Sequence, residues 1–169
     1  MKYIMGSFIY IRKCFGKNKR NLKLYKLRTM KLNADKNLKI AAQNGFDGLG
    51  KPVNDKRITF FGKFLRRYWI DELPQLYNFF KGDIKLVGIR PLSEAEWERY
   101  PPALMIRALK QKPGLMGFQY AYKKTVNFQS HLKQLEDYLH KWEQNPKKTD
   151  RHFFFRITKN ILFKGVRSR

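Results

Sequence analysis

The most apolar patterned stretch of the chain runs over residues 58–80 and reads ITFFGKFLRRYWIDELPQLYNFF. In its first half, aromatic and leucine residues recur at helical spacing with lysine and arginine between them, which predicts an amphipathic helix. In its second half, Pro74 stands three residues after Asp71, and proline is tolerated only in the first turn of a helix. Asp71 is therefore predicted to cap a second helix that continues through Gln75 to Phe80.

The segments on either side of this stretch add a hairpin and further helices. Residues 7–29 hold a run of strand formers, a polar break at 16–21 and a second alternating run, which together predict a β-hairpin. Residues 44–56 have the composition of a loop. Beyond the stretch, the patterns predict a strand over 84–87, a helix over 93–107 interrupted at Pro101-Pro102, and helices over 128–142 and 153–163. The sequence thus predicts an α+β fold, a mostly helical single domain over residues 1–169.

The composition narrows the class of protein. A length of 169 residues fits one domain, and a hydrophobic fraction of 43% is too high for a disordered chain. With 37 Lys and Arg against 13 Asp and Glu, the net charge of +24 indicates an anionic partner: a nucleic acid, a phosphorylated small molecule or an anionic membrane surface. A single cysteine excludes an intramolecular disulfide, and no apolar run approaches the ~20 residues of a spanning helix. We also expect no signal peptide.

The adjacent acids Asp71 and Glu72 are the sharpest chemical feature. At a helix N-terminus, free N–H groups and the macrodipole keep a carboxylate ionised and attract phosphate. An ionised aspartate there can attack phosphorus, and a neighbouring glutamate can hold Mg²⁺. Simple capping of the helix is the alternative interpretation of the same residues.

Basic residues accompany this pair along the chain. Arginine can clamp a phosphate with two hydrogen bonds, whereas each of these residues taken singly is equally consistent with a solvated surface charge. The candidates for phosphate binding are Lys26, Arg28, Arg66, Arg67 and Arg90. The interleaved aromatic and basic residues of 58–69 and 151–164 are consistent with a membrane-surface contact, stacking on single-stranded nucleic acid, or a packed core.

Five ordered blocks of sequence resemble the catalytic domain of the bacterial sugar transferases, the monotopic polyprenyl-phosphate phosphoglycosyl transferases. The resemblance covers roughly residues 6–120. Its blocks are the entry segment ending in Lys26-Leu27-Arg28-Thr29-Met30, the block from Arg57 to Arg67, the phrase from Ile70 to Asn78, the segment from Lys81 to Pro91, and Lys112-Pro113-Gly114-Leu115 with Gly117. Residues 121–169 form a basic, helical C-terminal part outside it.

The resemblance implies transfer of sugar 1-phosphate from a nucleotide sugar, such as a UDP-sugar, to polyprenyl (undecaprenyl) phosphate, which initiates synthesis of a surface polysaccharide. Asp71 would form a covalent phosphosugar intermediate, and Glu72 would assist. Both carboxylates would bind Mg²⁺. Lys26, Arg28, Arg66 and Arg90 would surround the phosphates. The place of action would be the cytoplasmic face of the bacterial inner membrane, with amphipathic helices at an anionic surface.

The chain also departs from the family's pattern. Family members usually carry a membrane-embedded helix before this segment, and only five residues precede Gly6 here. Trp69 stands where a small polar residue is usual. The other departures are Cys14 for an expected Arg, Ile89 for the first Pro of Gly-Pro-Arg-Pro, Met116 for Thr, and Gln119 one place early. A catalytically weak, truncated protein that binds membranes is therefore an alternative function. A basic nucleic-acid-binding module is a second, although no recognisable RNA- or DNA-binding phrase is present and no nucleic acid is expected as partner.

Overall fold

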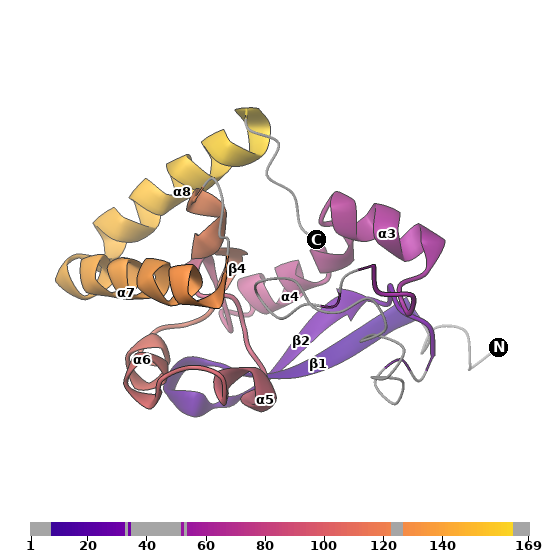
Figure 1. The fold of residues 1–169 in the computed structure, drawn as a ribbon, viewed down its shortest axis with the longest axis horizontal. Coiled ribbons are helices and arrows are strands. Elements are labelled where there is room, and N and C mark those ends of the chain that lie inside the picture. The colour runs from indigo at the N-terminus through magenta and orange to yellow at the C-terminus, as the bar shows by residue number, and fades with distance from the viewer. Residues whose placement is uncertain (1–7, 33, 35–51, 53, 123–126, 164–169) are drawn as a thin grey trace.

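The computed structural model describes residues 8–32, 34, 52, 54–122 and 127–163 (Figure 1). The α+β fold predicted from the sequence is confirmed. In Figure 1 a long N-terminal hairpin lies near α3 (Phe60–Arg67) and α4 (Gln75–Phe80). Helices α7 (Phe128–Gln144) and α8 (Pro146–Phe163) lie on the opposite side, and a small parallel sheet lies between the two parts. Most of the predicted loop over 44–56 lies outside the described residues.

The N-terminal hairpin has the predicted place and pairing. Strands β1 (Ile9–Phe15) and β2 (Asn21–Leu27) pair antiparallel, with Ile9 opposite Leu27 and Phe15 opposite Asn21. Cys14 on β1, with Leu22 and Leu24 on β2, is buried. These side chains pack with Ile84 in a small core of their own. The alternation that predicted the strands therefore buries one face of the hairpin.

Helix α3 (Phe60–Arg67) packs against the chain segment that directly follows the hairpin. Thr59 caps it, because its Oγ1 accepts a hydrogen bond from the Gly62 amide at 2.9 Å. A Cβ atom on Gly62 would lie 2.1 Å from the carbonyl oxygen of Thr29, so only glycine lets the helix approach the chain just after β2. Leu65 is the only apolar side chain of α3 that is buried, whereas its three phenylalanines are exposed.

The predicted capping role of Asp71 is wrong. Asp71 lies inside a 3₁₀ turn, η3 (Ile70–Glu72), and α4 (Gln75–Phe80) begins later, with Pro74 as the residue before its first turn. The turn starts early because Trp69 takes a left-handed backbone conformation, φ 57° and ψ 14°, and its carbonyl oxygen accepts a hydrogen bond from the Glu72 amide. Asp71 is therefore not placed at the N-terminus of α4, and its carboxylate is free for another purpose.

A small parallel sheet leads to Arg90, which lies beside the acidic pair. Strand β3 (Lys85–Gly88) confirms the predicted strand, and it pairs with β4 (Gly114–Gly117), which the sequence did not predict. Between them lie α5 (Glu94–Trp97) and α6 (Pro102–Ala108), so the predicted proline interruption is also confirmed. The 3₁₀ turn η4 (Phe118–Ala121) follows β4 directly.

The two C-terminal helices complete the main core. Helices α7 (Phe128–Gln144) and α8 (Pro146–Phe163) confirm the two predicted helices, and α8 begins seven residues earlier than expected. Their buried apolar side chains pack against residues of β3, α5, α6 and η4, and they are Leu135, Tyr138, Leu139, Phe153 and Ile157. The core interpretation is thus correct for one face of the 151–164 segment. No helix in the described ranges has both the length and the apolar character that crossing a bilayer requires.

Candidate active site

The acidic pair occupies the centre of a cluster of charges. Asp71 is only 6% exposed, and no described residue donates a hydrogen bond to its carboxylate. Glu72 is also largely buried, but its Oε1 accepts hydrogen bonds from Lys26 Nζ at 2.9 Å and from Arg90 Nη2 at 2.6 Å. Among the described residues, Asp71 is thus the member of the acidic pair whose carboxylate oxygens accept no hydrogen bond, and these oxygens are free to contact a ligand.

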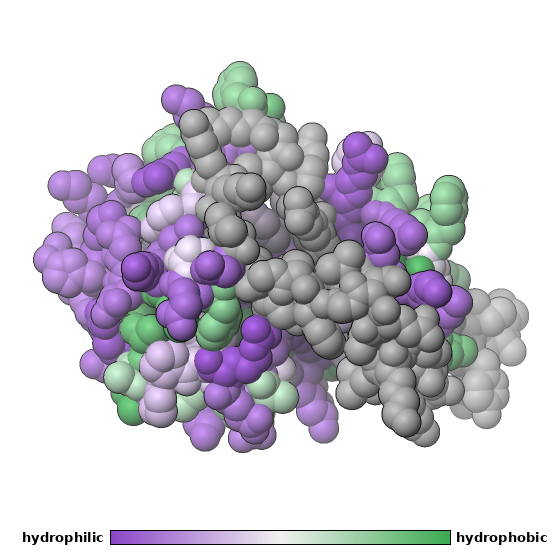
Figure 2. Space-filling model, viewed as in Figure 1, coloured by the Kyte–Doolittle hydropathy of each residue, from purple (hydrophilic) through white to green (hydrophobic). Residues whose placement is uncertain are grey.

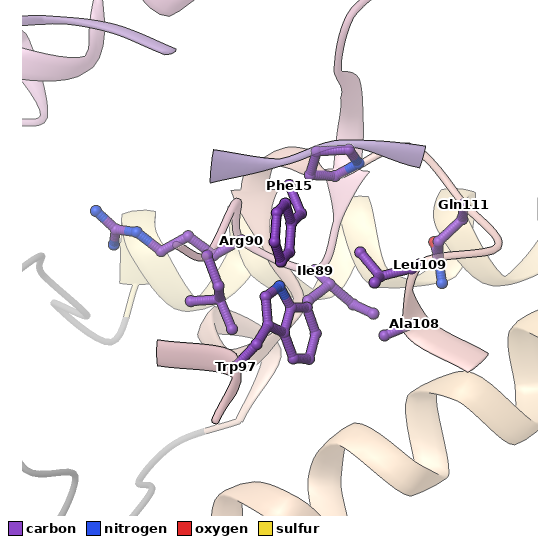
Figure 3. Close-up of a pocket in the computed structure, with 9 residues that line it drawn as sticks. Phe15, Ile89, Arg90, Trp97, Ala108, Leu109 and Gln111 are labelled. Atoms are coloured by element: carbon purple, nitrogen blue, oxygen red, sulfur yellow. The ribbon is translucent and has the colours of Figure 1, made fainter. Parts of the chain in front are cut away.

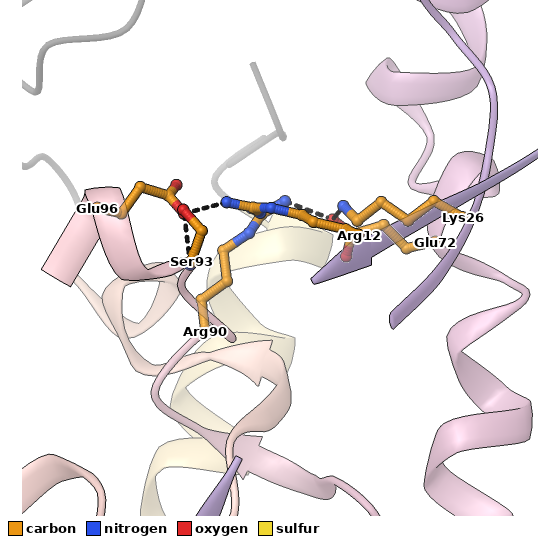
Figure 4. A network of polar contacts seen from close by, with 6 residues as sticks. All are labelled: Arg12, Lys26, Glu72, Arg90, Ser93 and Glu96. Carbon is orange, nitrogen blue, oxygen red and sulfur yellow. Dashed lines mark hydrogen bonds and ion pairs between the residues drawn. The ribbon is translucent and has the colours of Figure 1, made fainter. Parts of the chain in front are cut away.

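The cations around Glu72 come from separate elements. Lys26 extends from β2, and Arg90 follows β3, so the hairpin and the small sheet each supply one charge (Figure 4). This juxtaposition agrees with the sequence prediction that Lys26 and Arg90 accompany the pair. Arg66 on α3 donates from Nε to Thr29 Oγ1 at 2.9 Å and lies within electrostatic range of Asp71.

Two predicted basic residues have other neighbours. Arg28 lies over the ring of Tyr10 on β1, with its guanidinium carbon 5.8 Å from the ring centroid. Arg67 lies over the ring of Tyr68 at 6.0 Å. Neither ring contact involves the acidic pair, whereas Lys26 and Arg90 donate to Glu72 and Arg66 lies within electrostatic range of Asp71.

Sequence reasoning missed a second layer of charge. Arg12 on β1 forms an ion pair with Glu96 on α5, and Ser93 donates from its hydroxyl to the same carboxylate at 2.7 Å (Figure 4). Arg12, Lys26 and Arg90 converge between Glu72 and Glu96 in Figure 4. Two signals could have indicated part of this layer: the Ser-x-x-Glu capping box at 93–96, and the hairpin register, which puts Arg12 and Lys26 on one face.

Burial and charge shift the two carboxyl groups in opposite directions. Burial raises the pKa of Asp71 above its ordinary value, and the attraction of Lys26 only partly offsets that rise. Burial also acts to raise the pKa of Glu72, but Arg90 and Lys26 outweigh it and hold that pKa below its ordinary value. The pKa values of these two adjacent carboxyl groups are therefore shifted in opposite directions, a pattern that is common at functional sites.

Asn78 on α4 fixes the acidic pair relative to the hairpin. Its side chain is fully buried, donates to the Lys23 carbonyl at 2.8 Å and accepts from the Tyr25 amide at 3.2 Å. These are hydrogen bonds to the backbone of β2, just before Lys26. The contact fixes α4 on β2 close to Lys26, whose Nζ donates to Glu72 Oε1.

A small cavity near the cluster is not the candidate site. It is lined mainly by apolar core residues, including Phe15, Ile89, Trp97 and Leu109. Figure 3 shows that the guanidinium of Arg90, which also lines it, points away from the cavity. The chemistry-bearing groups therefore lie outside this cavity.

The acidic pair fits a magnesium ion that the substrate helps to hold. Mg²⁺ commonly takes one or two carboxylates and completes its shell with phosphate oxygens and water. Asp71 is free to supply one ligand, and Glu72 has a second oxygen beyond the one bound to Lys26 and Arg90. Among the described residues, no group of three or more acidic, histidine or cysteine side chains is arranged to hold a metal alone.

Comparisons with known proteins identify relatives of this chain. The sequence profile of the family described as "Bacterial sugar transferase" matches residues 2–163. The chain is 38% identical over 141 residues to the galactosyl transferase CpsE of Streptococcus agalactiae, which covers 81% of this chain and 31% of that protein. It is 33% identical over 144 residues to the exopolysaccharide production protein ExoY of Sinorhizobium fredii, covering 81% of this chain and 63% of that protein.

A third relative carries a name that states a reaction. The chain is 38% identical over 118 residues to the undecaprenyl-phosphate galactose phosphotransferase of Salmonella typhimurium, covering 66% of this chain and 25% of that protein. The chain therefore spans between a quarter and two thirds of the length of these relatives. Because the family profile covers nearly the whole sequence, the chain belongs to the bacterial sugar transferase family.

Proposed function

We propose that this chain transfers a sugar 1-phosphate from a nucleotide sugar to undecaprenyl phosphate, as a first membrane step in exopolysaccharide or capsule synthesis. The observation that carries the proposal is the buried Asp71, whose carboxylate accepts no hydrogen bond from the described residues, beside Glu72, Lys26 and Arg90. The names of three relatives, an undecaprenyl-phosphate galactose phosphotransferase, a UDP-galactose-lipid carrier transferase and an N-acetylgalactosaminephosphotransferase that uses a UDP-sugar, support this substrate class.

The proposed reaction has two balanced steps. An Asp71 carboxylate oxygen attacks the phosphorus attached to the sugar, the bond from that phosphorus to the bridging oxygen breaks, and nucleoside monophosphate leaves with the electron pair. A phosphate oxygen of undecaprenyl phosphate then attacks the same phosphorus and releases the Asp71 carboxylate. Arg90 and Lys26 would offset charge on the phosphoryl oxygens, and Arg66 would assist from α3.

The carboxylates of Asp71 and Glu72 would hold Mg²⁺ together with the substrate's phosphates. When bound, the ion would neutralise charge on the leaving nucleotide. The residues of the chain would supply the rest, because Lys26 and Arg90 keep Glu72 in place beside Asp71.

The direct test is release of nucleoside monophosphate from a panel of UDP-sugars in the presence of undecaprenyl phosphate and Mg²⁺. Release of about one equivalent of nucleoside monophosphate without undecaprenyl phosphate, and continued release with a diphosphate-linked lipid as product only when it is added, would support the proposal. A folded protein that binds vesicles but releases no nucleotide from any donor would contradict it and favour the alternative of a membrane-binding protein without catalysis.

Removing the divalent ion should lower turnover at least tenfold, because two phosphate groups must approach a carboxylate in one site. Turnover is measured with excess chelator and again after Mg²⁺ or Mn²⁺ is restored. A chain that keeps full turnover in chelator would exclude the metal from this reaction. The melting temperature in chelator serves as the control for folding.

The exposed face of α3 supports the proposed membrane association. Phe60 is 92% exposed, and Phe61 and Phe64 on the same helix are also exposed. Figure 2 shows hydrophobic side chains standing out over α3 and at the end of α8, where Leu162 and Phe163 are exposed. Lysine and arginine near an anionic surface contribute about 1 kcal/mol each, and inserted aromatic rings add an apolar contribution. We propose that these two regions contact the anionic face of the bacterial inner membrane.

Changing two of these rings should weaken binding to vesicles. Phe60→Ser combined with Phe61→Ser should lower partitioning to vesicles containing anionic lipid at least tenfold, because burying one phenylalanine is worth about 1.5–3 kcal/mol. Ile106→Ser is the control, since Ile106 is 60% exposed, close to the 65% of Phe61, but lies on α6, away from α3. Sedimentation at low and high salt measures the effect. Complete release of the unchanged protein at high salt would show that the rings do not insert.

A further inference from the structure

Two aromatic side chains connect the acidic pair to the C-terminal part of the chain. The rings of Trp69 and Tyr120 meet edge to face, with centroids 5.8 Å apart and planes at 87°. The Tyr120 hydroxyl accepts a hydrogen bond from Arg90 Nη1 at 3.3 Å. We propose that Trp69 and Tyr120 are positioning residues that fix the plane of the Arg90 guanidinium beside Asp71. This inference rests on the proposed function, in which Arg90 faces the transferred phosphate.

Both terminal nitrogens of the Arg90 guanidinium donate a hydrogen bond. Nη1 donates to Tyr120, and Nη2 donates to Glu72 Oε1 at 2.6 Å. A guanidinium that is held at one nitrogen only can still rotate, whereas two contacts define its plane. Because arginine binds phosphate through parallel N–H donors, the plane of the group decides whether it can meet phosphoryl oxygens.

The backbone at Trp69 is a second, independent sign of a role. A bulky residue with φ of 57° is disfavoured, and glycine would take this conformation without a Cβ clash. The chain nevertheless has tryptophan there, two residues before Asp71. Disfavoured conformations that persist next to reactive groups are typical of functional sites. In this position the indole is directed at Tyr120.

Helix α8 holds Tyr120 from the other side. Asn160 is 2% exposed, and its Nδ2 donates to the carbonyl oxygens of Tyr120 at 3.1 Å and Ala121 at 2.8 Å. These two hydrogen bonds fix η4 on α8. The C-terminal part, which lies outside the five resembling blocks, thereby supports the orientation of Arg90.

The decisive variant is Tyr120→Phe, which removes the hydroxyl and keeps the ring against Trp69. We expect kcat and kcat/KM to fall together by roughly 10- to 100-fold at an unchanged melting temperature, because a misplaced group acts on the transition state. Trp69→Gly should lower kcat similarly, and Trp69→Phe should restore most of it. Lys19→Gly is the matched control: Lys19 has φ of 60° in the exposed hairpin turn, and its replacement should leave kcat unchanged.

A nuclear magnetic resonance measurement on the full chain separates this inference from the proposed function. Separate Hη resonances of Arg90, assigned with Arg90→Lys, should be present in the unchanged protein and merge in Tyr120→Phe. That result would support the positioning role even if no donor sugar were turned over. Unchanged resonances in Tyr120→Phe, or losses of kcat that follow losses of melting temperature across the series, would overturn it.

Discussion

Replacing Asp71 with asparagine should lower turnover by roughly 10³-fold or more while leaving the fold intact. The amide has nearly the same shape but no ionised oxygen to attack phosphorus. The measurement is release of nucleoside monophosphate under conditions in which the unchanged protein is active, with circular dichroism as the check on folding. Near-normal turnover in a well-folded Asp71→Asn protein would end the covalent mechanism.

The same substitution should make the protein no less stable at neutral pH. Burial raises the pKa of Asp71, so the folded state binds its proton more tightly than the unfolded state does. The cost of ionising Asp71 is absent below the ordinary pKa and fully present above the raised one. The melting temperature of Asp71→Asn should therefore exceed that of the unchanged protein at neutral pH without metal, and the gap should narrow as the pH falls.

A stability gap of the opposite sign would assign Asp71 a structural role. Asp71→Glu serves as the control, because it keeps the charge and should show no such gain. The pH dependence thus tests whether the ionised Asp71 carboxylate lowers the free energy of unfolding. We expect this of a reactive group that accepts no hydrogen bond from the described residues.

Local sequence patterns predicted most of the elements. The alternation of the hairpin, the proline interruption between α5 and α6 and the apolar period of α7 depend on residues close in the chain, so they were visible without a structure. Strand β4 was missed because it is four residues long, has glycine at both ends, and is defined by its pairing with β3. Pairing over such a sequence separation leaves no local signal.

The sequence predicted which charged residues form the candidate site, but it did not predict their geometry. Lys26 and Arg90 lie beside the acidic pair as expected, but the sequence predicted that a helix N-terminus keeps Asp71 ionised. In the structure, the left-handed Trp69 starts the turn early, and burial dominates the pKa of Asp71. The role of Tyr120 depends on η4 lying against Arg90, which no local pattern reveals.

Replacing Glu72 with glutamine should have the second-largest effect, on both stability and turnover. Glu72 is the shared counter-charge of Lys26 and Arg90, and all three side chains are more than two thirds buried. Removing one partner of a buried ion pair leaves the others uncompensated and typically costs 3–5 kcal/mol. Since Arg90 keeps some exposure, we expect the free energy of unfolding to fall by about 2–4 kcal/mol.

The matched control is Glu143→Gln, which breaks a partly exposed pair with Arg107. That change should cost only about 0.2–1 kcal/mol, because water screens the pair. Urea denaturation of both variants measures the difference. Because Arg90 and Lys26 hold the pKa of Glu72 low, its contribution to stability is present above the ordinary glutamate pKa and is lost as the pH falls through the lowered one. Equal losses in the two variants at neutral pH would mean that Glu72 does not organise the cations, and the proposed division of roles between Glu72 and Asp71 would fail with it.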